Sequence, residues 1–296
     1  MALIAPLRGS LVFALMLLNI TFWGLVFFLT ALVLLIPVRG RGPWTRRRLQ
    51  TIVEAWSKGN QWIFRFLLNA RWEIDGTDDI RPDENYLVIA NHQSWLDIPA
   101  VHKALVDRTS FIKFFLKRQL LYVPIVGLAC WLLDFPFMKR YSKEFLAENP
   151  EKRGEDLAST RHALRFFGKV PVSILNFMEG TRFTKEKRIS TGSEYNHLLH
   201  PRSGGVAFVL GAVGDKLHGI LDLTIAYPPH DGDIFWNFLC GRISSVWIHV
   251  ERRPIPVEYI TDSTWNEPET REEFRAWIRE IWREKDQRIE ERRGRC

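Results

Sequence analysis

An uncharged apolar stretch near the N-terminus constrains the fold of this 296-residue chain more than any other feature. Between Arg8 and Arg39, GSLVFALMLLNITFWGLVFFLTALVLLIPV contains no charged side chain. A helix needs about 20 apolar residues to cross the ~30 Å hydrocarbon core of a bilayer, and this stretch is longer. We therefore predict a membrane segment over residues 9–38. Its length also permits a bent or re-entrant pair of helices hinged near Gly24, and the sequence leaves both forms open.

The residues that flank this segment indicate its orientation. A cleaved signal peptide has an apolar core of about 7–15 residues, so the longer run favours an anchor. Five arginines follow it between positions 39 and 48, against Arg8 alone before it. This excess predicts that the downstream chain faces the cytoplasm. We expect the net charge of +7 to attract anionic membrane lipids rather than nucleic acid.

Downstream of the arginines, the apolar pattern changes twice. Residues 51–70 carry tryptophans and apolar residues suited to an interfacial helix, so we assign residues 1–70 to membrane anchoring. From residue 71 onward, short apolar runs bounded by turn residues predict strands at 71–74, 85–90, 109–114, 171–177, 221–227 and 245–250. Helical patterns are found at 98–106, 153–168 and 203–213, and an amphipathic surface helix is expected around Phe274, Trp277, Ile278, Ile281 and Trp282.

Alternating strands and helices predict an α/β catalytic domain over residues 71–296, with a mixed, partly parallel sheet flanked by helices. The cysteines Cys130, Cys240 and Cys296 lie far apart and form no C-x-x-C, so a disulfide framework is not indicated. The eight histidines are scattered and H-E-x-x-H is absent, so we predict no metal site.

Two histidine–aspartate pairs share one spacing in this sequence. NHQSWLD holds His92 and Asp97, and HKALVD holds His102 and Asp107. Five residues along an α-helix turn through about 140°, and in a strand they fall on opposite faces, so only a strand-to-helix turn brings such side chains together. NHQSWLD follows a predicted strand and precedes Pro99, which fits the first turn of a helix. Asp97 is then either a catalytic partner of His92 or a helix N-cap, and context alone does not choose.

Further motifs decide between these interpretations. NHQSWLD resembles the H-x4-D motif of the glycerolipid acyltransferases, the family that includes 1-acylglycerol-3-phosphate acyltransferase, and NFMEGTRFT (176–184) resembles its F-P-E-G-T-R block. KRQLLYVPIVG (117–127) with FPFMKR (135–140), and TIAYP (224–228), are similar to two more blocks in the same order. The longer runs look most like the bacterial inner-membrane branch. Met178 replaces the common proline, which predicts a less rigid turn before Glu179, and Arg202 stands where lysine is frequent.

This resemblance implies the fold and the site of the glycerol-3-phosphate acyltransferases. His92 is expected to be the general base that deprotonates a hydroxyl, with Asp97 orienting its ring. No G-x-S-x-G occurs, so we expect direct transfer without an acyl-enzyme. Arg182 is expected to bind phosphate through its planar fork. The other expected substrate-binding residues are Lys117, Arg140, Glu179, Gly180, Thr181 and Arg202, whereas the basic segment 183–188 is expected to be a solvated loop.

The predicted reaction moves a fatty acyl group from a thioester to a lysophospholipid, with lysophosphatidic acid giving phosphatidic acid. Acyl-CoA or acyl carrier protein is the expected co-substrate, and no bound cofactor is expected. Another lysophospholipid, or a lyso-aminolipid, is the alternative acceptor. A more distant alternative is a membrane-tethered basic lipid-binding protein without catalysis.

Overall fold

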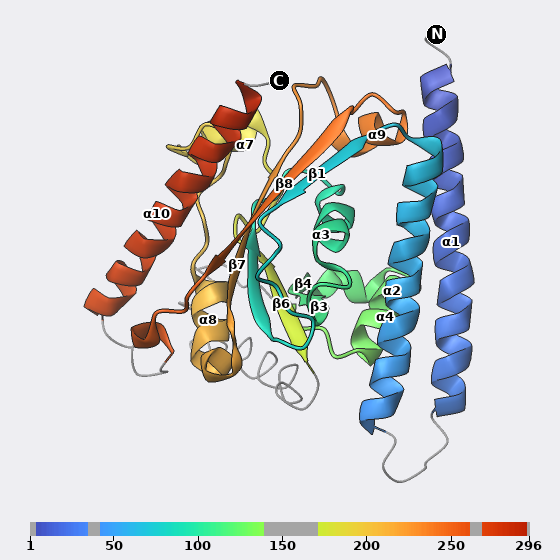
Figure 1. The fold of residues 1–296 in the computed structure, drawn as a ribbon, viewed down its shortest axis with the longest axis horizontal. Coiled ribbons are helices and arrows are strands. Elements are labelled where there is room, and N and C mark those ends of the chain that lie inside the picture. The colour runs from blue at the N-terminus through green and yellow to red at the C-terminus, as the bar shows by residue number, and fades with distance from the viewer. Residues whose placement is uncertain (1–3, 35–41, 139–170, 261–267, 295–296) are drawn as a thin grey trace.

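The computed structural model describes residues 4–34, 42–138, 171–260 and 268–294 (Figure 1). Two long helices open the chain, and a six-stranded sheet follows. The helices are α1 (Ile4–Leu34), α2 (Gly42–Leu67), α3 (Asp97–Leu105), α4 (Val126–Leu132), α7 (Lys185–Ser190), α8 (Gly204–Val213), α9 (Ile234–Leu239) and α10 (Pro268–Arg293). The main sheet contains β1 (Arg71–Asp75), β2 (Tyr86–Ala90), β3 (Phe111–Phe114), β6 (Val172–Phe177), β7 (Gly219–Ala226) and β8 (Ser245–Arg253), and a small second sheet pairs β4 (Leu116–Lys117) with β5 (Phe137–Met138).

The strand order of the main sheet is β1-β8-β7-β2-β6-β3. All neighbours are parallel except β7 and β8, which are antiparallel. The six predicted strands are the six strands of this sheet, and the prediction of a mixed, partly parallel α/β fold is confirmed. Ala90 at the end of β2 pairs with Phe177 of β6 and Leu223 of β7. The loops after these three strands therefore meet at one edge, where open α/β sheets bind their ligands.

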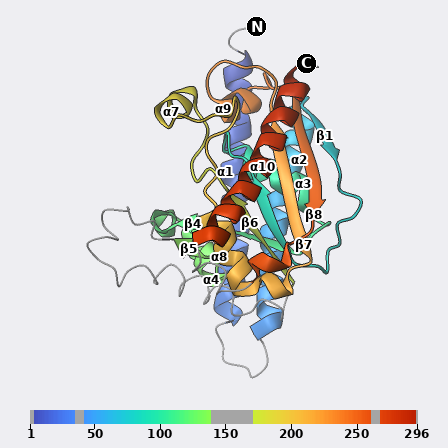
Figure 2. The same ribbon diagram turned by 90° about the vertical axis from the view of Figure 1, so that its left-hand side faces the viewer.

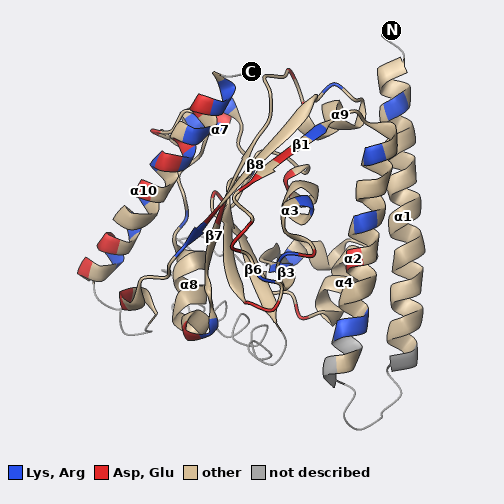
Figure 3. Cartoon of the chain, in the orientation of Figure 1, with Lys and Arg blue, Asp and Glu red and all other residues tan. Residues whose placement is uncertain are grey.

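Helices cover both faces of the sheet (Figures 1 and 2). On one face, α8 and α10 bury apolar side chains against alternate positions of β2, β6 and β7. Phe274, Ile278, Ile281 and Trp282 of α10 are buried, as the amphipathic pattern predicted, while charges of both signs cover its outer side (Figure 3). On the opposite face, α3 lies between the sheet and the pair α1–α2.

The two N-terminal helices form an antiparallel pair (Figure 1). Asn19 of α1 donates hydrogen bonds to the Trp56 carbonyl and to Asn60 Oδ1 of α2, each at 2.9 Å. Gly59 lies against Asn19, where a Cβ would come within 2.5 Å of Asn19 Oδ1. Of the two forms that the sequence left open, the pair hinged near Gly24 is not formed, because α1 runs unbroken from Ile4 to Leu34. Its partner is α2, which begins nine residues earlier than predicted.

Helix α1 packs on the rest of the chain along its whole length. Near its start, Gly9 lies against Trp236 of α9 and Cys240 directly after it, and further along Gly24 lies against Ile125 at the start of α4. Its outer side is apolar and more than half exposed at Leu11, Leu18, Phe22, Leu25, Leu29 and Leu32. Residues Ile4–Leu32 form a helix long and apolar enough to cross a membrane, with a mean hydropathy of 2.3. The division of the chain at residue 70 stays a prediction, and the predicted helix at 153–168 lies outside the described residues.

Candidate active site

His92 and Asp97 lie in hydrogen-bond contact at the edge where β2, β6 and β7 end. β2 stops at Ala90 and α3 starts at Asp97, so residues 91–96 form the strand-to-helix turn. His92 Nδ1 lies 2.7 Å from Asp97 Oδ2, and the ring of His92 stacks on Phe177 with centroids 4.3 Å apart. Because a carboxylate only accepts, Nδ1 carries the hydrogen and Nε2 keeps the lone pair that takes up a proton.

Asp97 does not cap the helix that it begins. Its side chain is fully buried, and no side-chain cap bond forms at the start of α3. Instead, Oδ2 accepts from the backbone N–H of Gln93 at 2.6 Å and of Ser94 at 2.8 Å, besides His92. Oδ1 accepts from the hydroxyl of Tyr227 at 2.5 Å. The N-cap interpretation is therefore wrong, and the carboxylate serves the turn that carries His92.

His102 and Asp107 are separated, as helix geometry requires. His102 is buried in α3, where neither ring nitrogen has a hydrogen-bond partner among the described residues, and burial lowers its pKa to about 4. Asp107 lies beyond the helix with φ +67° and pairs with Lys58 at 2.8 Å on the surface. HKALVD therefore supplies no acid–base pair.

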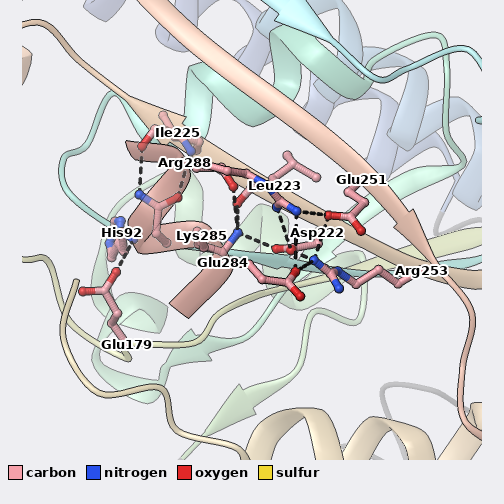
Figure 4. Close-up of polar contacts among 12 residues, drawn as sticks. His92, Glu179, Asp222, Leu223, Ile225, Glu251, Arg253, Glu284, Lys285 and Arg288 are labelled. Carbon is pink, nitrogen blue, oxygen red and sulfur yellow. Dashed lines mark hydrogen bonds and ion pairs between the residues drawn. The ribbon is translucent and has the colours of Figure 1, made fainter. Parts of the chain in front are cut away.

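Glu179 is turned into the protein rather than toward a substrate (Figure 4). Its Oε1 accepts from the N–H of His92 at 2.8 Å and its Oε2 from the N–H of Leu199 at 2.9 Å. The side chain is buried, and this burial raises the pKa of Glu179 to about 8. We expected Glu179 to contact the glycerol of an acceptor, but both its oxygens are occupied, so it fastens the loop after β6 to the His92 turn.

Arg182 and Thr181 follow Glu179 and face the same opening as His92. The guanidinium of Arg182 lies over the ring of Trp95, 5.0 Å from its centroid, so the NHQSWLD turn also positions the phosphate-binding candidate. Gly180 has φ +67°, a conformation that glycine adopts without strain. This turn brings Thr181 and Arg182 back toward the end of β2.

Lys187 is a cation of this site that the sequence prediction missed. Segment 183–188 was expected to be a solvated loop, but Thr184 caps the short helix α7 by accepting from Lys187 N. The Lys187 ammonium turns back to donate to Thr181 Oγ1 at 2.8 Å and to the Arg182 carbonyl at 2.9 Å. A threonine before four polar residues was the available signal for such a cap.

The structure does not bring the other predicted substrate-binding cations, Lys117, Arg140 and Arg202, into this cluster among the described side chains. Lys117 ends β4 and its side chain is not described, and Arg140 lies outside the described residues. Arg202 is exposed, and its N–H donates to the Met178 carbonyl at 2.7 Å. Met178 itself is buried and donates its N–H to the Ala90 carbonyl at 3.2 Å, a bond that proline cannot make. The turn is thus held on both sides, contrary to the expectation of reduced rigidity.

A cavity of about 630 Å³ joins this polar cluster to the N-terminal helices. At one end it is lined by His92, Thr181, Arg182 and Lys187. The remainder is mainly apolar and draws its walls from distant elements: Ile20, Trp23 and Phe27 of α1, Ile52 and Val53 of α2, and Val126 and Ala129 of α4. One cavity is therefore lined by a candidate base, two cations and many apolar side chains.

Comparison with known proteins decides the family. The acyltransferase family model matches residues 71–227, which include the sheet edge and every described residue of the polar cluster. The chain belongs to the acyltransferase family. It is therefore an enzyme of acyl transfer, and the resemblance to the glycerolipid acyltransferases is confirmed. Membership of the bacterial inner-membrane branch stays a prediction.

The relatives of this acyltransferase carry lipid-directed names. It is 26% identical over 286 residues to lysocardiolipin acyltransferase 1 of Gallus gallus, covering 91% of this chain and 69% of the relative. The Danio rerio protein of that name is 28% identical over 297 residues, covering 94% and 70%. Human 1-acyl-sn-glycerol-3-phosphate acyltransferase delta is 26% identical over 214 residues, covering 69% of this chain and about half (52%) of the relative.

The acyltransferase also resembles a solved structure, the 1-acyl-sn-glycerophosphate acyltransferase PlsC of Thermotoga maritima. The TM-score is 0.56 at 18% identity, covering 99% of this chain and 97% of that one. At this identity the likeness supports the fold. Within the described part of the acyltransferase, no three His, Cys, Asp or Glu residues are grouped in a way that could hold a metal ion.

Proposed function

We propose that this acyltransferase moves a fatty acyl group from acyl-CoA or acyl carrier protein to the free hydroxyl of lysophosphatidic acid, forming phosphatidic acid. The observation that carries the proposal is the single cavity lined by His92 and Arg182 at one end and by apolar side chains at the other. A lysophospholipid offers a matching group to each of these: a free hydroxyl to His92, a phosphate to Arg182 and a hydrocarbon chain to the apolar side chains.

The chemistry follows from the orientation of His92. Nε2 removes the proton of the acceptor hydroxyl as its oxygen attacks the thioester carbonyl carbon. The new C–O bond forms, the C–S bond breaks, and the departing thiolate takes the proton from His92. Asp97 stabilises the imidazolium between these two proton transfers. No covalent enzyme intermediate is required.

Recognition of the phosphate is assigned to the cations at the polar end. Arg182 has its face on Trp95 and its fork of N–H donors available for two phosphate oxygens. Lys187 lines the same opening. Lys117 and Arg140 remain proposed phosphate contacts, and Arg202 a weaker one on account of its exposure. A phosphate monoester, with its two negative charges, suits such a cluster.

Membrane attachment is proposed for the outer side of α1 together with α2. Exposed Trp44 and Trp62 each lie under an arginine, Arg48 at 5.0 Å and Arg65 at 5.7 Å, which suits the headgroup layer of anionic lipids. We place the enzyme at the cytoplasmic face of the inner membrane. Both substrates carry long chains, so the apolar part of the cavity, walled by α1 and α2, is well placed to receive them from lipid.

A second acceptor is favoured by one observation. The lysocardiolipin acyltransferases align over more than nine-tenths of this chain, whereas the 1-acyl-sn-glycerol-3-phosphate acyltransferase aligns over 69%. The alternative is therefore a lysophospholipid whose phosphate is a diester. The base and its partner would act in the same way, and only the headgroup contacts would differ.

A lipid panel tests the proposal. Purified protein in detergent is incubated with lysophosphatidic acid, other lysophospholipids and a lyso-aminolipid, each with acyl-CoA or acyl carrier protein, and products are followed by mass spectrometry. We expect phosphatidic acid as the main product and release of free thiol. Preferential acylation of lysocardiolipin would select the second acceptor, and binding without thiol release would overturn the enzyme role of this site.

Membrane attachment is tested by charge on the outer side of α1. Deleting residues 1–40 is not a clean test, because Val12 and Phe27 are buried in the cores. We expect Leu18→Glu with Leu25→Glu to keep the fold and to reduce binding to anionic vesicles. Val257→Glu changes an apolar residue that is 77% exposed elsewhere and is the matched control. Equal vesicle binding by all three proteins would contradict the proposed face.

A further inference from the structure

Tyr227 contacts the side of Asp97 that faces away from His92. Its hydroxyl donates to Oδ1 at 2.5 Å, while His92 and two backbone amides occupy Oδ2. Tyr227 is 2% exposed and Asp97 is fully buried, so solvent cannot replace this donor. Burial and the charge of Asp97 raise the pKa of Tyr227 well above 10, and the hydroxyl therefore remains a donor throughout the working range.

The position of Tyr227 is set by Asn91, the residue before His92. Asn91 Oδ1 accepts from Ile225 N at 2.8 Å and Asn91 Nδ2 donates to Ile225 O at 2.9 Å. The side-chain amide thus takes the place of a backbone peptide group of a neighbouring strand. Gln93 Nε2 adds a bond to Ile225 O at 3.2 Å. These contacts extend the pairing of β2 with β7 beyond Ala90. The NHQSWLD turn thereby holds the backbone that presents Tyr227.

A carboxylate needs such a second contact to hold its orientation. Rotation about the terminal bond of an aspartate is soft and nearly two-fold, so the two oxygens exchange places readily unless each has its own donor. If Oδ1 lost its donor, a charged oxygen would be left unsatisfied in the interior, and the carboxylate would turn to share the remaining donors. The bond to His92 Nδ1 would then be displaced.

We propose that Tyr227 is a positioning residue of acyl transfer, which fixes the rotamer of Asp97 and through it the tautomer and orientation of His92. This rests on the proposed roles of His92 and Asp97. Asn91 belongs to the same device, because it places Tyr227. The active unit is then a relay of three side chains, His92, Asp97 and Tyr227, drawn from the loops after β2 and β7.

Tyr227→Phe tests the proposal, with Tyr86→Phe as its matched control. Tyr86 is also buried and donates its hydroxyl to a carboxylate, Glu84, at the opposite end of β2. We expect Tyr227→Phe to lower kcat by roughly 10- to 100-fold, the size of one hydrogen bond to a charged group, with KM for donor and acceptor changed less than about twofold. Tyr86→Phe should keep kcat while losing similar thermal stability. Full kcat in Tyr227→Phe would overturn the proposal.

A double-mutant cycle distinguishes positioning from general support of the fold. If Tyr227 acts through Asp97, Tyr227→Phe should cost nothing further in an Asp97→Asn background, because the coupling lies between residues in contact. The same fold-loss in both backgrounds would reject the relay. If the native protein transfers no acyl group at all, the proposed function is refuted. Failure of the proposed function and failure of the relay are therefore distinguishable.

The pH profile gives a readout that is independent of residual activity in Asp97→Asn. The ionisable groups around His92 are Asp97 of α3, Glu179 and Arg182 after β6, Lys187 of α7 and Tyr227 after β7. Without the Tyr227 donor, the displaced carboxylate of Asp97 stabilises the imidazolium less. We expect the acid limb of kcat/KM to move to lower pH in Tyr227→Phe and to stay in place in Tyr86→Phe. An unmoved limb would count against the relay.

Discussion

Two fully buried aspartates of this protein, Asp97 and Asp222, are held by opposite kinds of partner. Asp97 accepts from two backbone amides, a tyrosine and His92. Asp222, in the middle of β7, is surrounded by cations: Lys285 on Oδ1, and Arg253 at 3.2 Å and Arg288 at 3.6 Å on Oδ2 (Figure 4).

The difference explains why Asp97 suits the proposed catalytic role and Asp222 does not. Asp222 has its charge balanced by α10 and β8, and Lys285 also donates to the Leu223 carbonyl at 2.5 Å, so this cluster fastens the last helix to the sheet. The partners of Asp97 are neutral except for His92, whose charge changes in the proposed reaction. A buried carboxylate held mainly by neutral donors can stabilise a transient cation, whereas one already paired with cations cannot.

The largest expected effect is loss of turnover in His92→Ala. Removing a positioned general base typically costs about 10²–10⁴-fold in rate, and we expect kcat to fall by that amount at unchanged thermal stability. His249→Ala is the matched control, because His249 is hydrogen-bonded to Asp75 through Nδ1 on the surface of the sheet. Comparable loss in both variants, measured by product formation, would show that a histidine–aspartate contact alone does not mark the site.

Breaking the second cluster should affect stability instead of chemistry. Asp222→Ala leaves Lys285 buried without its counter-ion, which costs roughly 3–5 kcal/mol in comparable sites. We expect a lower free energy of unfolding, measured by denaturant, with kcat per folded molecule largely kept. Replacing both residues, Asp222→Leu with Lys285→Met, should recover part of the loss. A kcat collapse in a stable Asp222→Ala protein would remove the distinction between the two aspartates.

His102 extends the comparison of Asp97 with Asp222, because it is a buried ionisable side chain without a hydrogen-bond partner among the described residues. His102 titrates near 4 in the folded protein and near 6.5 when unfolded, so stability is lost as pH falls through this window. His102→Phe removes the dependence, and between pH 7.5 and pH 5 native protein should lose about 2 kcal/mol relative to the variant. Thermal unfolding at both values measures this. A constant difference would mean that His102 gains a partner in solution.

The smallest expected effect concerns two arginines with different duties. The proposed role of Arg182 uses its fork for a ligand, whereas Arg253 is engaged by Asp222, Glu251 and Glu284. Arg182→Lys should raise the acceptor KM by about tenfold, since lysine cannot bind phosphate through a planar fork. Arg253→Lys should leave that KM unchanged. Kinetics with a short-chain soluble acceptor measure both, and equal KM values would argue against phosphate binding by Arg182.

The sequence sufficed for features with local causes. Six strands follow from short apolar runs between turn residues, and the contact of His92 with Asp97 follows from a turn between strand and helix. Glu179 was misplaced because its direction depends on Leu199, twenty positions away. The hydroxyl of Tyr227 was not anticipated beside Asp97, since their contact depends on the pairing of β2 with β7. The walls of the cavity were not predicted either, because they depend on how α1 and α2 pack against elements that are distant in the sequence.

The packing of Gly9 of α1 against Cys240, directly after α9, has a consequence for biosynthesis. These positions are 231 residues apart, so at about 5–20 residues per second Cys240 is translated roughly 10–50 s after Gly9. During that interval α1 can pack on α2, but the surface around Gly9 has yet to receive its native contact. A bilayer that received α1 early would shelter it until α9 is made, and the final docking would occur at the membrane rather than in free solution.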